Sequence, residues 1–219
     1  MELLKKYRVP VFFLVGFVIY TILVRTIDVK TIGPQGSWVG FSGVNGLFSR
    51  LIGYHPVLYT ITEFLGIIAL LPVVLFGVVG LLQLIQRKSL LAVDKDILVL
   101  GGIYIGVLLC YILFNKVVIN YRPVILDEGL EASYPSSHTM LAVCVLSTAY
   151  KEFQWRLKRS SFKNTLLKTC RVLMVLIVLG RLFSGVHWLT DIIGGLILSG
   201  FFVTLFKALT MDCKWSRKK

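Results

Sequence analysis

Charged residues are scarce in this sequence: Asp, Glu, Lys and Arg make up only 16% of its 219 residues, and just 11 residues are acidic. A soluble domain is about 25% charged and about 45–50% apolar, whereas 56% of this chain is hydrophobic and its mean hydropathy is +0.80. So few polar side chains cannot cover the surface of a water-soluble fold. The composition therefore argues against a secreted globular domain, a disordered chain and a soluble nucleic-acid binder. It predicts a polytopic helical membrane protein.

Cysteine is also rare, and the sequence contains no CxxC motif. The four cysteines lie in or beside apolar runs, at Cys110, Cys144, Cys170 and Cys213. Such isolated cysteines indicate neither a zinc site nor a disulfide framework. We expect no metal and no cofactor.

Positive charge is in excess, with 24 basic against 11 acidic residues and a net charge of +13. The basic residues cluster between hydrophobic runs, which is typical of topology determinants in membrane proteins and not of a nucleic-acid site. Of the 24 Lys and Arg residues, 18 fall in segments 1–8, 86–96, 151–171 and 207–219. The positive-inside rule then predicts a cell-membrane protein with both termini in the cytoplasm.

Long apolar runs recur along the chain, and a helix needs about 20 such residues to cross a bilayer. We expect an all-α bundle of six transmembrane helices in a single domain (1–219). The predicted spans are 9–24, 64–85, 97–114, 136–150, one starting at 172, and 188–206. Basic residues before the first run resemble a signal peptide, but no small-residue cleavage site follows, so we expect a retained helix. Pro72 is expected to kink the second span.

The connection between the first two predicted spans, 26–63, is long and alternates glycine with aromatic residues. Such a pattern with few charges favours a segment lying at the level of the lipid headgroups. An ordinary outer loop is the alternative.

Three short stretches, 116–123, 134–138 and 181–191, carry most of the residues suited to chemistry. In the predicted topology all three lie at the outer ends of spans. Together they supply basic, imidazole, hydroxyl and carboxylate groups: Lys116, Arg122, Arg181, His138, His187, Ser136, Ser137 and Asp191. Such a set suits a phosphate dianion, because arginine offers bidentate hydrogen bonds to phosphate oxygens. The nearby acidic residues Asp127, Glu128 and Glu131 are expected to form a solvated loop face.

Spacing within these stretches predicts individual roles. His187 and Asp191 are four residues apart, so on a helix they share a face, and the carboxylate can orient the imidazole for nucleophilic attack. Ser136, preceded by proline, predicts a helix start whose free backbone N–H groups can bind phosphate. His138, in the first turn of that helix, is placed to protonate a leaving oxygen.

The same residues resemble the type 2 phosphatidic acid phosphatase family, membrane lipid phosphatases that share a fold with vanadium haloperoxidases. The family signature is K-x6-R-P, then P-S-G-H, then S-R-x5-H-x3-D. The chain matches it at Arg122-Pro123, at Pro135, Ser136 and His138, and at Arg181, His187 and Asp191. The resemblance covers roughly residues 60–206.

Three positions depart from this signature. Ser137 stands in place of glycine and Gly180 in place of serine. Lys116 is one residue closer to Arg122 than the family spacing, so that Asn115 holds the lysine position. A shift of one residue turns a side chain by about 100° on a helix, so Lys116 departs from the direction of the family lysine.

The resemblance implies a metal-independent lipid phosphatase that acts through a phosphohistidine on His187. His138 would protonate the leaving group, Asp191 would orient His187, and Lys116, Arg122, Arg181 and the serines would bind phosphate. The expected substrate is an isoprenoid or glycerolipid phosphate or diphosphate on the outer face of the bilayer. Undecaprenyl diphosphate is favoured, and phosphatidylglycerol phosphate or phosphatidic acid comes next.

Two other functions stay open. A transporter or lipid-binding protein could use the charged cluster as an anion site, and a lipid phosphotransferase would differ from a hydrolase only in its acceptor. The sequence does not predict the oligomeric state.

Overall fold

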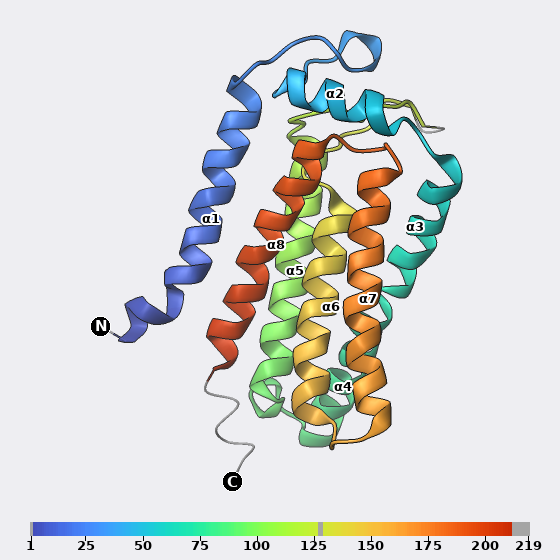
Figure 1. Ribbon diagram of the computed structural model, residues 1–219. Coiled ribbons are helices and arrows are strands. Elements are labelled where there is room, and N and C mark those ends of the chain that lie inside the picture. Colours follow the sequence, from blue (N-terminus) through green and yellow to red (C-terminus); the bar gives the residue numbers. More distant parts are fainter. Residues whose placement is uncertain (1, 127–128, 212–219) are drawn as a thin grey trace.

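The computed structural model describes residues 2–126 and 129–211, which form helices joined by loops, with isolated β-bridges but no strand (Figure 1). The predicted all-α class is thus confirmed for these residues. The α-helices are α1 (Glu2–Thr26), α2 (Ser42–Ile52), α3 (Pro56–Ile68), α4 (Leu71–Arg87), α5 (Lys95–Lys116), α6 (Ser137–Arg156), α7 (Ser161–Phe183) and α8 (Leu189–Thr210). Short 3-10 helices span Pro34–Gly36 and Leu90–Ala92.

All the helices except α2 run along a common bundle, and α2 lies across one end of it (Figure 1). Helix α6 packs against α7, α8, α5 and α4, while α1 covers α8. The start of α1 and the end of α8 lie toward the end opposite α2 (Figure 1). The end beside α2 therefore gathers α2 itself, the loop between α5 and α6, and the loop between α7 and α8.

The second predicted span is divided in two. Helix α3 ends at Ile68, and α4 begins at Leu71 with Pro72 in its first turn. The predicted interruption at this proline is confirmed, since proline in a first turn lacks only a hydrogen bond that the turn would not make. The expected start of the span at residue 64 is wrong, because α3 begins eight residues earlier, at Pro56. Glu63 consequently lies inside a helix.

The long connection 26–63 is neither an unstructured loop nor wholly interfacial. Its middle forms α2, which is held to α8 by Asn45: the buried side chain donates to Thr190 Oγ1 at 2.9 Å and to Gly40 O at 2.7 Å. Its last part belongs to α3. The placement of α2 at the headgroup level stays a prediction.

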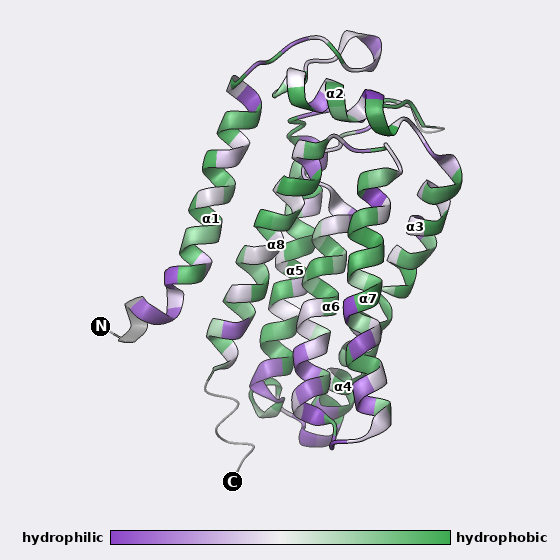
Figure 2. Cartoon of the chain, viewed as in Figure 1, coloured by the Kyte–Doolittle hydropathy of each residue, from purple (hydrophilic) through white to green (hydrophobic). Residues whose placement is uncertain are grey.

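Four candidate spans have the length and hydropathy to cross a membrane: Lys5–Thr26, Pro56–Arg87, Lys95–Lys116 and Leu189–Thr210. Large apolar side chains along α1, α3, α4 and α5 are exposed, and hydrophilic residues gather near the junction of α4 with α5 (Figure 2). Helices α6 and α7, also predicted as spans, are more polar. Because α6 is largely covered by its neighbours, it can carry buried polar groups such as Thr148 and Glu152. Six spans are therefore not confirmed.

Candidate active site

The first turn of α6 forms one wall of the candidate site. Ser136 is its N-cap, as predicted, and its Oγ accepts a hydrogen bond from Thr139 N at 3.4 Å. The backbone N–H of Ser136 donates to Asp191 O at 3.0 Å, which joins this turn to the start of α8. The Ser136 side chain is buried and caps the helix, while the half-buried Ser137 lines a small cavity.

His138 faces α3 across the site. Its Nε2 lies 3.2 Å from Glu63 Oε2, and its buried Nδ1 has no hydrogen-bond partner among the described residues. A quarter of the His138 side chain is exposed. One nitrogen is thus held by a carboxylate and the other is available to a ligand, which fits the predicted proton donor.

Arg181, near the end of α7, is completely buried. Its Nη2 donates to Glu63 Oε1, and its guanidinium carbon lies 5.1 Å from the centre of the Tyr59 ring. Within the described part of the chain, Nε and Nη1 have no hydrogen-bond partner. Unsatisfied buried donors are costly in a native protein, so these two atoms point to an anionic ligand.

Arg122 is the second arginine of the site and is nearly buried. Its Nε lies 2.8 Å from Glu131 Oε2, and its backbone N–H donates to Glu131 O at 2.9 Å. Its Nη1 is buried without a partner in 2–126 and 129–211. The prediction that Glu131 belongs to a solvated loop face is wrong, because arginine binding draws it inward; Asp127 and Glu128 lie outside the described residues.

His187 and Asp191 meet across the start of α8 and not along one helix face. Helix α8 begins only at Leu189, and His187 lies in the loop before it. His187 Nδ1 is 3.7 Å from Asp191 Oδ2, which is too far for a hydrogen bond. The Asp191 carboxylate instead accepts from Trp188 N at 2.9 Å and from Asn120 Nδ2 at 3.2 Å. Asp191 therefore fixes the backbone beside His187, and the shared face predicted for the pair is wrong.

The loop that carries His187 makes an unusually close turn. Gly185 has φ of 73°, and a Cβ there would lie 1.8 Å from Gly53 O. Only glycine suits this position, since other residues rarely adopt a positive φ. The turn brings the loop against the connection between α2 and α3, where His55 N donates to Ser184 O at 3.0 Å.

The electrostatic surroundings keep His187 neutral. Burial, followed by the charges of Arg122, Arg181 and His138, holds the pKa of His187 well below its usual value. The buried ring nitrogens have no hydrogen-bond partner among the described residues. A neutral imidazole has a free lone pair, so His187 has the protonation state that a nucleophile needs.

Lys116 does not join this cluster. It is the last residue of α5, its side chain is exposed, and none of the ion pairs described for the site includes it. Asn115, at the position given by the family spacing, instead lines a cavity of about 20 Å³ with Ser137 and His187. Neighbouring helix positions differ by about 100° in direction, which agrees with a cavity lined by Asn115 and not by Lys116.

The described residues offer no group of three His, Cys, Asp or Glu side chains arranged to hold a metal. Cys110, Cys144 and Cys170 are free thiols, and Cys213 lies outside the described residues. The arrangement of the site suits an anion: two buried guanidinium groups, two imidazoles and a helix N-terminus meet at one end of the bundle. The expectation of a metal-free site stays a prediction.

Sequence reasoning missed Glu63, Asn120 and the inward turn of Glu131. Glu63 had a detectable signal, because Pro56 is a typical first-turn residue and a helix from there encloses a lone carboxylate in an apolar run. Asn120 had none, since its contact with Asp191 joins residues 71 positions apart.

The fold and the site define a multi-pass helical membrane protein with an anion site at one end. The sequence model of the PAP2 superfamily matches residues 116–215, a segment that holds every residue of the site except Glu63 and Asn115. This part of the chain is similar to the PAP2 superfamily, and the predicted resemblance to type 2 phosphatidic acid phosphatases is confirmed.

A curated relative and a solved structure, both from Bacillus subtilis, are similar to this chain. Phosphatidylglycerophosphatase B of strain 168 is 33% identical over 101 residues, which cover 46% of this chain and 49% of that protein. The match thus spans about half the length of this curated relative. The crystal structure of a transmembrane PAP2 type phosphatidylglycerolphosphate phosphatase has a TM-score of 0.64 at 21% identity, covering 94% of this chain and 97% of that one. The second likeness extends the shared fold to nearly the whole chain.

Proposed function

We propose that this protein is a lipid phosphatase in which His187 forms a covalent phosphohistidine. The observation that carries the proposal is a set of buried polar atoms on Arg122, Arg181, His138 and His187 at one end of the bundle, which have no hydrogen-bond partner in residues 2–126 and 129–211. Phosphate oxygens can satisfy the guanidinium donors in pairs. The match of residues 116–215 to the PAP2 superfamily model supports the same reaction class.

The reaction proceeds in two steps. A ring nitrogen of His187 attacks phosphorus, the P–O bond to the lipid breaks, and His138 gives its proton to the departing oxygen. Water then attacks phosphorus while His138 takes a proton from that water. The P–N bond breaks, which releases inorganic phosphate and restores the neutral imidazole of His187. Arg122 and Arg181 stabilise the charge on the phosphoryl oxygens in both transition states. Asp191 acts as a positioning residue, through its hydrogen bond to Trp188 N.

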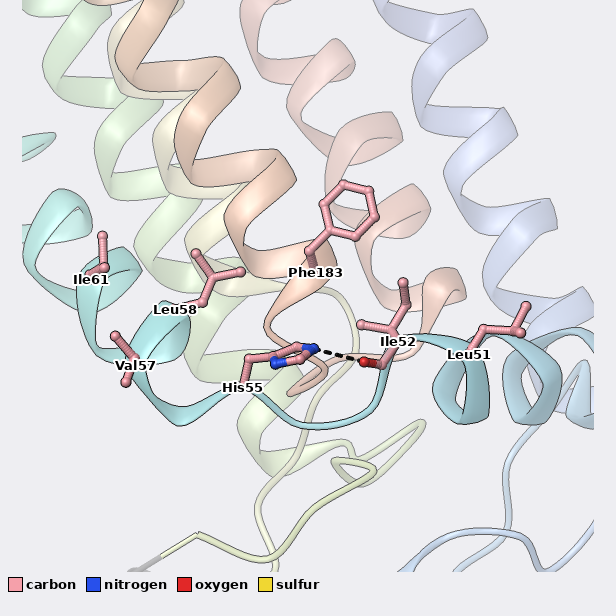
Figure 3. A pocket seen from close by; sticks show the side chains of 7 residues that line it. All are labelled: Leu51, Ile52, His55, Val57, Leu58, Ile61 and Phe183. Carbon is pink, nitrogen blue, oxygen red and sulfur yellow. Dashed lines mark hydrogen bonds between the residues drawn. The ribbon is translucent and has the colours of Figure 1, made fainter.

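A lipid substrate is supported by an apolar groove of about 560 Å³ beside the site (Figure 3). The groove lies between α2, α3 and α7, the last two being the helices that carry Glu63 and Arg181. Its lining is almost wholly apolar: Leu51, Ile52, His55, Val57, Leu58, Ile61 and Phe183. We assign it to part of the lipid tail of the substrate.

The name of the Bacillus relative makes phosphatidylglycerophosphate the first substrate to test, ahead of phosphatidic acid and the undecaprenyl diphosphate favoured by sequence. The proposal includes six spans, with α6 and α7 crossing the membrane inside the bundle. It places both termini in the cytoplasm and the site on the outer face, supported by the distribution of basic residues.

The experiment measures phosphate release from these three lipids by the full chain in detergent, with EDTA present throughout. Wild type is expected to release phosphate, and His187→Ala is expected to abolish release. Denaturing gels after a brief reaction with lipid carrying ³²P in the scissile phosphate are expected to show an acid-labile label on wild type alone. Release that survives in His187→Ala would contradict the proposal, and no release from any lipid would favour the anion-transport alternative.

A further inference from the structure

Glu63 is an acidic residue inside a site built for an acidic ligand. Its two carboxylate oxygens bind two different cationic or protonatable groups: Oε1 accepts from Arg181 Nη2, and Oε2 lies 3.2 Å from His138 Nε2. Arg181 and His138 are the groups that would bind and protonate a substrate phosphate. A carboxylate that bridges them imitates two oxygens of a phosphoryl group.

We propose that Glu63 is an internal counterion that competes with the substrate phosphate for Arg181 and His138, and so sets the affinity of the site for anions. This inference rests on the proposed function, because it assigns the same site to phosphate. It adds a residue that lies outside the matched family segment, 116–215. Glu63 is 37% exposed on its side chain, so the carboxylate can turn away from Arg181 without unfolding α3.

The packing of α3 holds Glu63 in this position. A Cβ on Gly66 would lie 2.9 Å from the His138 ring, and a Cβ on Gly180 would lie 2.4 Å from Thr62 Cγ2. Both glycines therefore permit α3 to approach α6 and α7 closely. Gly180 is the position at which this chain departs from the serine of the family signature, and the space is filled by the residue next to Glu63.

Without a ligand, the carboxylates of the site already outnumber its arginines by one. Arg122 and Arg181 bring two positive charges, whereas Glu63, Glu131 and Asp191 bring three negative ones. A phosphate dianion would add two more negative charges to a largely buried cluster, which is strongly unfavourable unless a carboxylate leaves. Asp191 is fully buried behind Trp188, and Glu131 lies in the loop segment that pairs with Arg122 through its backbone. Glu63 is the most exposed of the three and is the one that shares its partners with the substrate.

The available space agrees with this balance. The cavity beside His187 measures about 20 Å³, which is room for about one water molecule and not for a phosphoryl group. The lining described for this cavity includes His187 but not Glu63, so a phosphoryl group needs space beyond it. Glu63 holds one nitrogen of Arg181 and one of His138, and a phosphate that uses these two nitrogens must displace it.

The test is the affinity for inorganic phosphate, measured by isothermal titration calorimetry on the full chain in detergent. Glu63→Gln keeps the shape of the side chain and removes its charge. We expect it to bind phosphate at least about tenfold more tightly than wild type, a difference of about 1.4 kcal/mol. The matched control is Asp28→Asn, which also removes one negative charge but from an exposed carboxylate paired with Lys30; its affinity should stay within about twofold of wild type.

Unchanged or weaker binding by Glu63→Gln would overturn the proposal, because it would show that Glu63 only orients Arg181. A second variant, Glu63→Asp, shortens the side chain and retains the charge; we expect intermediate affinity, and it decides the question if Glu63→Gln does not fold. The lipid-hydrolysis assay is run in parallel. Failure of wild type to release phosphate would refute the proposed enzyme activity, while the calorimetric comparison would still decide the role of Glu63.

Discussion

Two clusters of charged side chains lie at opposite ends of this bundle and have nearly the same composition. Beside α2, Arg122 pairs with Glu131 and Arg181 pairs with Glu63, while the Asp191 carboxylate lies beside His187. At the other end, Arg87 and Arg156 meet Asp94, Asp96 and Glu152. Each cluster contains two guanidinium groups and three carboxylates. The residue types alone do not distinguish a ligand site from a structural junction.

The difference lies in how the donors are used. Arg156 binds a carboxylate through each of its nitrogens: Nε to Glu152 at 2.7 Å, Nη1 to Asp94 at 3.1 Å and Nη2 to Asp96 at 2.8 Å. Arg181, in contrast, leaves Nε and Nη1 buried without partners in the described part of the chain. The fully paired Arg156 joins α6 to the junction of α4 with α5. The unpaired donors of Arg181 can instead bind a ligand. Two histidines accompany the unsaturated cluster only.

The largest effect that distinguishes the clusters is expected from His187→Ala. Loss of the nucleophile should lower the rate of phosphate release by at least about 10³-fold, with little change in melting temperature. The measurement is initial rate on lipid phosphate beside thermal unfolding in detergent. A variant with more than a tenth of the wild-type rate would remove His187 from the mechanism.

Arg181→Lys should lower kcat/KM by about 10²-fold, because lysine cannot present two donors to phosphate in a fixed geometry. The corresponding change at the other cluster, Arg156→Lys, is its matched control. It should leave kcat/KM within about twofold. If both variants lost activity equally, the distinction between a ligand site and a structural junction would fail.

Arg156→Met should act on stability instead of activity. Removing one partner from a buried group of charges lowers the free energy of unfolding by about 3–5 kcal/mol. Because Arg156 is partly exposed, we expect a loss of about 3 kcal/mol or less. Thermal unfolding in detergent should show a clearly lower melting temperature, while the rate per folded molecule is unchanged. A stable but inactive variant would show that this cluster also serves the reaction.

The two clusters should also respond to acid over different ranges. His187 is held neutral because its pKa lies well below its usual value, so kcat/KM should not fall on its account until the pH drops clearly below about 6.5. Burial alone would raise the pKa of Asp94. Hydrogen bonds from Arg87, Gln83 and Arg156 outweigh burial and lower this pKa to about 2. A lowered carboxyl pKa stabilises the fold above about pH 4, and this contribution is lost between about pH 4 and 2. Rates and melting temperatures measured from pH 8 to 2 check both ranges; an acid limb of kcat/KM that begins above pH 7 would contradict the His187 assignment.

Lys116→Ala should have the smallest effect, within about twofold on kcat/KM, since the exposed ammonium lies outside the site cluster. Asn115→Ala, which alters a residue lining the cavity with His187, should be the more damaging of the pair. Steady-state kinetics on the same lipid compare them. The reverse order would mean that Lys116 reaches the phosphate when substrate binds.

Much of the site could be predicted because its residues lie in short local motifs. The cap at Ser136 and the proline-associated break before α4 follow from local spacing, since helix starts and loops are specified by neighbouring residues. The grouping of Arg122, His138, Arg181 and His187 followed from the predicted topology, which put their three stretches at the same ends of spans. The prediction that His187 and Asp191 share a helix face was wrong. A spacing of four residues implies a shared face only if both residues lie within the helix, and α8 begins after His187. The sequence analysis assigned phosphate binding to Lys116 and not to Asn115. Which of the two lines the site depends on where α5 ends, at Lys116.

What the sequence by itself determined is the environment and the chemistry: too little charge for a soluble fold, apolar runs of membrane length, and the phosphate-type motifs. What only the tertiary structure decided is which charges meet. Glu63 reaches Arg181 and His138 across 118 and 75 positions of sequence, and Arg156 reaches Asp94 across 62. Such contacts depend on how closely helices pack, here on the missing side chains of Gly66 and Gly180, and no local pattern encodes that distance.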